Sequence, residues 1–300
     1  MGRRPTIVLA AACVAALVPS AARAGGDPPT LAACGQTLWL TSEAGLIEAN
    51  AVTGRTLRTL RTSRPYATGV VCDAGHAYVT SVENGFVDGT VDRFDARRGR
   101  RTRISHRAGG VFGIALAFGR VFVIAGGARR RVVELAHGPR PEHSLRLPGP
   151  AWISGGRDLA IVGEDRDLRL RSLDGRERVV ASAIDGPALL CPSGVLAVSR
   201  GHLSLIGSPS GWSAPFTAEA ITCDAAAAWV ATSDDTGTRT TTRRLRIGDG
   251  RVTRRVVIDG IVVAAARAQR VIWLATGGPT VRLVGLNPET LAVVSSRVIA

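Results

Sequence analysis

A pattern of short apolar and polar segments recurs along most of the chain. In each copy, an apolar run leads into a tight turn, and a second run follows that contains one large apolar anchor residue. A variable polar loop, an alternating run, another turn and a final polar run complete the copy. Short β-branched and aromatic runs bounded by Gly, Asp and Asn are typical of strands and hairpins. The anchors of the seven copies are Trp39, Tyr78, Phe122, Leu159, Leu196, Trp229 and Trp273.

The second copy shows the predicted unit most clearly. Residues 69–72, 77–81, 90–95 and 101–105 are its four predicted strands. Successive anchors lie 33 to 44 residues apart, and four antiparallel strands in about 40 residues form one blade of a β-propeller. We therefore predict an all-β fold, a seven-bladed β-propeller with four antiparallel strands per blade. A β-sandwich also has short strands and frequent turns, but it does not explain a sevenfold repeat.

The last predicted blade is one continuous segment, residues 261–299. No strand from the N-terminus is needed to complete it. We therefore expect the ring to close by packing between the first and last blades.

The N-terminus has the three regions of an export signal. Arg3 and Arg4 precede an apolar run at residues 7–18, and Ala22-Arg23-Ala24 fits a small-x-small cleavage site. The apolar run is shorter than the about 20 residues that a membrane-spanning helix needs. We predict a signal peptide at 1–24 and a single propeller domain at 25–300, secreted or held in the cell envelope. A lipoprotein acylated at Cys13 is the alternative.

Arginine dominates the charge of this chain. It contains 38 arginines and no lysine, against 24 acids. Without the three arginines of the predicted signal, the formal charge of +14 falls to about +11, and such a surface attracts anions. We attribute the excess mainly to a codon bias toward Arg, Ala, Gly and Val, with an anionic partner as the alternative. The absence of lysine excludes Schiff-base chemistry on a lysine side chain.

Four cysteines remain after the predicted signal: Cys34, Cys72, Cys191 and Cys223. Each lies five or six residues before its anchor, in blades one, two, five and six. Equivalent inner positions of neighbouring blades lie close to the axis, so we predict the disulfides Cys34–Cys72 and Cys191–Cys223. The alternative is that these cysteines fill small buried sites as free thiols.

Three turns carry a resemblance to a known group of proteins. The segments around Gly54 (AVTGRTLRTL), Asp95 (RFDARRGRRT) and Asn287 (GLNPETLAVV) resemble the D-x-x-T-G turn of bacterial YVTN-type and quinoprotein-like propellers. The resemblance covers nearly the whole chain after the signal and implies a fold, not a reaction. Streptogramin lyases are similar in their anchor strands, but they use His and Glu in late blades, and this chain has no His beyond His202.

Acidic and basic residues are concentrated in different classes of loop. Loops between strands two and three contain Glu43, Glu83, Asp88, Glu164, Asp165, Asp167, Asp234 and Asp235. Turns between strands three and four contain Arg55, Arg97, Arg98, Arg100, Arg140, Arg176 and Arg251. In a propeller these two loop classes lie on opposite faces. One interpretation is a relatively acidic face for a cation or cationic ligand, and a basic face toward an anionic surface. The alternative is that the loops are simply polar and the acids only balance nearby arginines.

The sequence favours a non-catalytic propeller that binds a protein or a small ligand at the mouth of its central channel. The chain lacks HExxH, P-loop, G-x-S-x-G and CxxC motifs, and we predict no cofactor and no metal site. Its aromatic residues are mostly strand anchors, so we expect no nucleic-acid binding. We also expect a monomer without a transmembrane segment. The alternative is a propeller enzyme of the lyase, lactonase or quinoprotein type that acts at the central channel.

Overall fold

The computed structural model describes residues 30–83, 88–126, 129–135, 143–145, 149–277 and 280–299. The predicted signal peptide lies outside the described residues. Among the residues that are described, no helix is long and apolar enough to cross a membrane.

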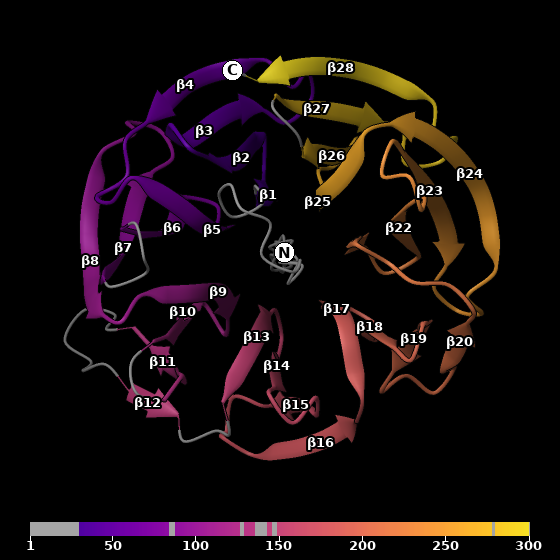
Figure 1. Cartoon of the computed structure of the whole chain (residues 1–300), viewed down its shortest axis with the longest axis horizontal. Helices are drawn as coiled ribbons and strands as arrows, with labels where there is room; N and C mark the ends of the chain where they lie inside the picture. Colours follow the sequence, from indigo (N-terminus) through magenta and orange to yellow (C-terminus); the bar gives the residue numbers. More distant parts are fainter. Residues whose placement is uncertain are drawn as a thin grey trace, which may run out of the picture.

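Seven four-stranded antiparallel sheets surround a central axis (Figure 1). The fold is the predicted seven-bladed β-propeller. Blades one to three contain β1 (Leu31–Cys34), β2 (Thr37–Ser42), β3 (Gly45–Asn50), β4 (Thr56–Leu60), β5 (Tyr66–Cys72), β6 (His76–Val82), β7 (Asp88–Asp95), β8 (Arg101–Ala108), β9 (Val111–Ala117), β10 (Arg120–Ala125), β11 (Arg131–Glu134) and β12 (His143–Leu145).

The remaining blades follow the same order. Blades four to seven contain β13 (Pro150–Gly155), β14 (Leu159–Gly163), β15 (Leu168–Arg171), β16 (Glu177–Ala181), β17 (Ile184–Cys191), β18 (Gly194–Ser199), β19 (His202–Ile206), β20 (Trp212–Ala214), β21 (Ala220–Cys223), β22 (Ala227–Ser233), β23 (Arg239–Arg246), β24 (Val252–Asp259), β25 (Ile261–Arg267), β26 (Ile272–Gly277), β27 (Val281–Leu286) and β28 (Val293–Ile299). Every blade pairs its strands in sequence order. The seventh blade is one continuous segment, as predicted.

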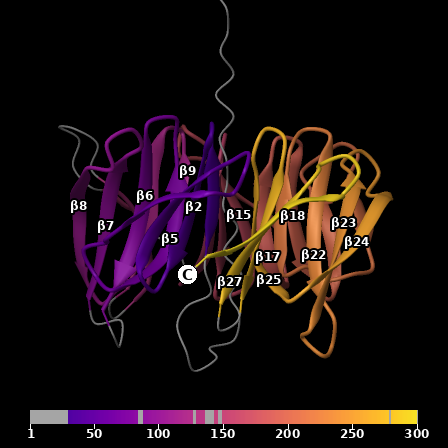
Figure 2. The same ribbon diagram turned by 90° about the horizontal axis from the view of Figure 1, so that it is seen from above.

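The strands run along the axis, so the loops gather on two faces (Figure 2). Loops that link strands two to three and strands four to one form what we call the loop face. Turns that link strands one to two and strands three to four form the turn face. This arrangement follows from the antiparallel order within each blade.

The hydrophobic core consists of seven clusters, one at each interface between neighbouring blades. Both faces of each sheet are therefore used for packing, and the burial of apolar surface there is the main favourable term for folding. The inner strands lie nearest the axis, where space is smallest (Figure 1). Small residues such as Ala32, Ala115, Ala220 and Ala265 fill these positions and are almost fully buried.

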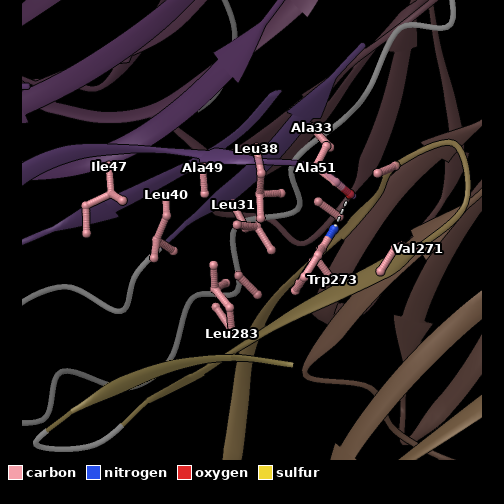
Figure 3. Packing of buried hydrophobic residues seen from close by; sticks show 14 of the residues in the cluster. Leu31, Ala33, Leu38, Leu40, Ile47, Ala49, Ala51, Val271, Trp273 and Leu283 are labelled. Atoms are coloured by element: carbon pink, nitrogen blue, oxygen red, sulfur yellow. Dashed lines mark hydrogen bonds between the residues drawn. The ribbon is translucent and has the colours of Figure 1, made fainter. Parts of the chain in front are cut away.

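The interface between blades one and seven closes the ring (Figure 3). The Trp273 indole of β26 is fully buried and donates a hydrogen bond from Nε1 to the Ala51 carbonyl oxygen at 2.7 Å. Ala51 begins the turn between β3 and β4, and the Asn50 side chain accepts hydrogen bonds from two backbone amides of this turn, each 2.9 Å long. The Ser295 hydroxyl of β28 donates to the Thr53 carbonyl in the same turn at 3.2 Å. The first and last blades are thus joined by polar contacts as well as by apolar packing.

Two more tryptophans make the same kind of contact with the next blade. Trp229 Nε1 donates to the Pro288 carbonyl at 3.0 Å, and Trp212 Nε1 donates to the Ile247 carbonyl at 2.7 Å. Each acceptor lies in the turn between strands three and four of the following blade. The turn residues therefore serve as docking points for the indoles of their neighbours, a role that the sequence pattern does not reveal.

Gly54 is required in the closing turn for two reasons. Its φ of +68° is in the left-handed region, and a Cβ atom added there would lie 2.5 Å from the Trp273 ring. Gly119 has a nearly equal φ of +70°, but an added Cβ would meet no atom within 4 Å. We expect Gly119→Ala to cost about 1 kcal/mol from backbone strain alone. Gly54→Ala should cost more because it also displaces the indole.

Urea unfolding of the two variants measures this difference. The expected result is a lower midpoint for Gly54→Ala than for Gly119→Ala, with a single transition in each. Equal midpoints would show that the indole does not pack tightly on the turn.

Both predicted disulfides are present. Cys34 ends β1 and is bonded to Cys72 at the end of β5, while Cys191 ends β17 and is bonded to Cys223 at the end of β21. The Cα–Cα distance is 6.0 Å in each pair. Each bond joins the inner strands of two adjacent blades at their turn-face ends. Neighbouring blades are therefore held together covalently at two of the seven interfaces.

We expect each disulfide to stabilise the fold through the loop that it closes in the unfolded chain. The sequence separations are 38 and 32 residues, for which the chain-entropy relation gives about 4 kcal/mol each. Urea unfolding of Cys34→Ala/Cys72→Ala and of Cys191→Ala/Cys223→Ala should show losses of this order. Alkylation of the denatured, unreduced protein should label none of these four cysteines, and labelling of all four would contradict the assignment.

Candidate functional site

The eight predicted loop acids all lie on the loop face, in blades one, two, four and six. They do not converge on one site. Two of them pair with an arginine in blade two, and two pair with an arginine in blade four. One more accepts hydrogen bonds from its own loop, and the remaining three are isolated carboxylates. Within the described ranges, no group of three or more His, Cys, Asp or Glu side chains could hold a metal ion.

The cluster of blade two is organised by Arg64. This residue lies in the loop between β4 and β5 and forms ion pairs with Glu83 and Asp88. His106 of β8 places Nε2 at 2.9 Å from the Asp88 carboxylate and 3.4 Å from Arg64 Nη2. The register of β7 and β8 pairs Thr90 with His106, which brings the imidazole toward the start of β7. Three separate elements thus meet at one guanidinium group.

A buried carboxylate anchors the loop that carries Arg64. Asp92 of β7 is fully buried and accepts hydrogen bonds from the Ser63 amide and hydroxyl, both at 2.6 Å. Arg103 Nε donates to the same Ser63 hydroxyl at 3.2 Å. Because buried charges require partners of this kind, Asp92 holds the loop in place and Arg64 with it.

The electrostatics of this cluster favour ionised Asp88. The hydrogen bond with His106 lowers the pKa of Asp88, and the nearby charges of His106 and Arg64 lower it further. The guanidinium group of Arg64 compensates both carboxylates, so the cluster ties the loop between blades one and two to the outer strands of blade two.

Arg169 forms the corresponding cluster in blade four. Its guanidinium nitrogens lie 2.5 and 3.0 Å from the two carboxylate oxygens of Asp165 and 3.4 Å from Asp167. Glu177 of β16 lies 3.7 Å away. The hydrogen bond from Arg169 lowers the pKa of Asp165. Two of the predicted ligand-facing acids are therefore committed to an internal ion pair.

The other four acids are of two kinds. The Asp234 carboxylate accepts hydrogen bonds from the Thr238 and Arg239 amides at 3.0 and 3.3 Å and so shapes its own loop. Glu43, Glu164 and Asp235 are exposed. Across the part of the chain that the structure describes, these three form no ion pair and no side-chain hydrogen bond. They lie on blades one, four and six and are available to a ligand.

The loop face carries both signs of charge. The loops between strands two and three also contain four arginines: Arg129, Arg130, Arg166 and Arg200. On the turn face, the predicted arginines Arg55, Arg97, Arg98, Arg100, Arg176 and Arg251 lie in or beside the turns between strands three and four, and Arg140 lies outside the described residues. The three isolated carboxylates are therefore distinct points on a face of mixed charge.

The inner strands nearest the axis are mostly apolar. The seven inner strands contain two charged residues, Asp185 at the loop-face end of β17 and Arg267 at the turn-face end of β25. The Asp185 carboxylate accepts a hydrogen bond from the Arg200 amide at 2.8 Å, and Arg267 lies 3.4 Å from Asp224. Charged side chains are thus concentrated in the loops and outer strands.

The pKa of Asp88 tests the cluster in blade two. In the folded protein this pKa lies below the unfolded value of about 4, so the cluster stabilises the fold above that pH. The stabilisation is lost as the pH falls through the folded pKa. We expect His106→Ala to raise the pKa of Asp88, because the hydrogen bond is the largest cause of its lowering.

Carbon-detected NMR titration of the Asp88 carboxyl group measures this change. His202→Ala is the matched control, because His202 is an exposed histidine of β19 in a different blade. An Asp88 titration that is unchanged by His106→Ala would contradict the assigned hydrogen bond.

Comparison with known proteins identifies the fold. No protein-family model matches the chain, and no curated protein matches it in sequence. The β-propeller domain of Cps50 (Swd1) from Myceliophteria thermophila is similar in structure, with a TM-score of 0.55 and 12% identity, over 89% of this chain and 94% of that one. The designed protein Ika8 has a TM-score of 0.54 and 11% identity, over 96% of this chain and 88% of that one.

A third similar structure is an enzyme by name. It is the dihydro-heme d1 dehydrogenase NirN in complex with DHE, with a TM-score of 0.50 and 13% identity, over 96% of this chain and 73% of that one. A designed protein and a dehydrogenase thus share this architecture. At these identities the likeness shows a β-propeller and not an activity.

Proposed function

We propose that this chain is an exported, non-catalytic β-propeller that binds a protein partner through its loop face. The observation that carries the proposal is the set of three isolated carboxylates, Glu43, Glu164 and Asp235, on three separate blades of that face. Groups spread over blades one, four and six match a partner of macromolecular size better than a small molecule. Carboxylates without an internal cation favour cationic groups on that partner.

The two disulfides support a location outside the cytoplasm. Disulfides form and persist in oxidising compartments, and both bonds join neighbouring blades. The apolar inner strands support a role at the surface of the ring rather than in its channel. The alternative remains an enzyme that acts at the channel, with Asp185 as the single carboxylate on an inner strand.

Binding of a fluorescent peptide of about 20 residues, rich in arginine and lysine, tests the proposal at low ionic strength, where such attractions are least screened. We expect saturable binding to the natural protein. Glu43→Gln/Glu164→Gln/Asp235→Asn should weaken this binding about tenfold, because it removes three charge-assisted contacts.

The matched control removes the same number of charges from the turn face. Asp158→Asn/Asp174→Asn/Asp249→Asn should change the affinity by less than about twofold. An equal loss in both variants would show that only net charge matters, and no saturable binding would overturn the proposal. A thermal shift of the natural protein with calcium or pyrroloquinoline quinone would favour the enzymatic alternative.

A further inference from the structure

Blade six carries two pairs of arginines that face each other directly across β23 and β24. Arg243 is paired with Arg255 and Arg244 with Arg254 in the register of these strands. Like charges directly opposite each other on a sheet are destabilising. An anion close to each pair would relieve this repulsion.

The Arg244–Arg254 pair, on the side of blade six that faces blade seven, has such an anion within the protein. Arg244 Nη2 lies 2.7 Å from a carboxylate oxygen of Glu289, in the turn between β27 and β28. Arg244 also donates to the Thr253 hydroxyl at 3.1 Å. This face of blade six packs against blade seven through Trp229.

The Arg243–Arg255 pair, on the side of blade six that faces blade five, has no such partner among the residues that the structure describes. Neither Arg243 nor Arg255 forms an ion pair with any carboxylate among the described residues. Burial lowers the pKa of Arg243, and the charge of Arg255 lowers it further. The same arrangement of two arginines is thus compensated on one face of the sheet and uncompensated on the other.

Arg243 is nevertheless held in a defined position. Its Nη1 donates to the Thr232 hydroxyl at 3.3 Å, and the Thr232 hydroxyl donates to the Thr217 carbonyl at 2.7 Å. The guanidinium carbon lies 5.2 Å from the centre of the Phe216 ring, which is within the range of a cation–π contact. The guanidinium group has five N–H donors, so most of them remain for a ligand.

The short outer strand of blade five leaves Arg255 exposed and Arg243 half-buried. This strand, β20, has only three residues, whereas β24 of blade six has eight. Arg255 is exposed, and Val257 beside it on the same strand face is 47% exposed. The Thr241 hydroxyl lies two residues from Arg243 on the same face of β23 and adds a further donor.

We propose that Arg243 and Arg255, with the Thr241 hydroxyl, form a binding site for a tetrahedral oxyanion, the phosphate or sulfate group of an acidic ligand. Guanidinium groups bind such oxyanions through parallel charge-assisted hydrogen bonds. The bound anion compensates the charge of Arg243 and Arg255, as Glu289 compensates the charge of Arg244 on the other face of the blade. This site is separate from the loop-face carboxylates and does not depend on the proposed partner.

Titration with sodium sulfate and with sodium phosphate tests the site, at constant ionic strength in a chloride buffer. We expect saturable binding by calorimetry and a chemical-shift change at Arg243 Nε–Hε in NMR spectra. Arg255→Gln should weaken sulfate binding about tenfold or more, because it removes charge-assisted hydrogen bonds. It should also raise the unfolding temperature in chloride alone, since it removes the repulsion between the two arginines.

Arg254→Gln is the matched control. It removes the same charge from the neighbouring position of β24, on the opposite face of the sheet, and should leave sulfate affinity within about twofold of the natural value. Equal weakening by Arg254→Gln and Arg255→Gln would overturn the proposal, as would the absence of saturable binding. The sulfate result does not depend on whether the cationic peptide binds, because the peptide experiment tests the loop-face carboxylates and not Arg243 and Arg255.

Two further probes distinguish the source of the anion. Dextran sulfate represents a sulfated polysaccharide, and vesicles of phosphatidylglycerol represent a phosphate-bearing membrane surface. The probe whose affinity falls with Arg255→Gln but not with Arg254→Gln identifies the ligand class. If neither probe shows this difference while inorganic sulfate does, the site is one for the small anion.

Discussion

The hydrogen bond from the Trp273 indole to the Ala51 carbonyl joins the last blade to the first, across a sequence separation of 222 residues. Every other interface between blades is formed by consecutive segments of the chain. The closing interface alone must bring distant segments together, and the entropy of closing such a large loop opposes it. The buried indole, the Asn50–Gly54 turn and the apolar cluster beneath them supply the compensating contacts. Because each blade packs on two neighbours, the stability of the whole ring depends on this one junction.

The use of both sheet faces for packing also determines where function can reside. Apolar clusters occupy all seven interfaces, and the inner strands are almost free of charge. Charged groups are left to the loops and the outer strands. Some of them form ion pairs there, as Arg64 does with Glu83 and Asp88. Both proposals concern charged groups that form no ion pair among the described residues, namely the three loop-face carboxylates and the Arg243–Arg255 pair.

Much of the fold can be predicted from the sequence, because the repeat is local. The alternation of apolar and polar residues identifies the strands of each blade, and the turns separate them. The disulfides were predictable because Cys34 and Cys72 occupy equivalent positions in adjacent repeats, as do Cys191 and Cys223. The continuous last blade follows from the same register.

The side-chain contacts were less predictable, because they depend on contacts between repeats and on the exact geometry within each blade. The docking of Trp273 on Ala51 depends on closure of the ring, which no local pattern shows. Seven of the eight acids lie in loops and Asp88 is the first residue of β7, but the pairing of four of them with Arg64 and Arg169 depends on side-chain geometry. The opposition of Arg243 and Arg255 depends on the exact pairing of β23 with β24, which contains an irregularity after Arg244.

Hydrogen exchange of Trp273→Phe tests the central role of ring closure most directly. The substitution keeps a buried aromatic ring but removes the donor to the Ala51 carbonyl, at an expected cost of about 1–3 kcal/mol. If the junction stabilises the whole ring, the slowest-exchanging amides of blades three, four and five should lose as much protection as those of blades one and seven. A loss of protection confined to blades one and seven would contradict this account.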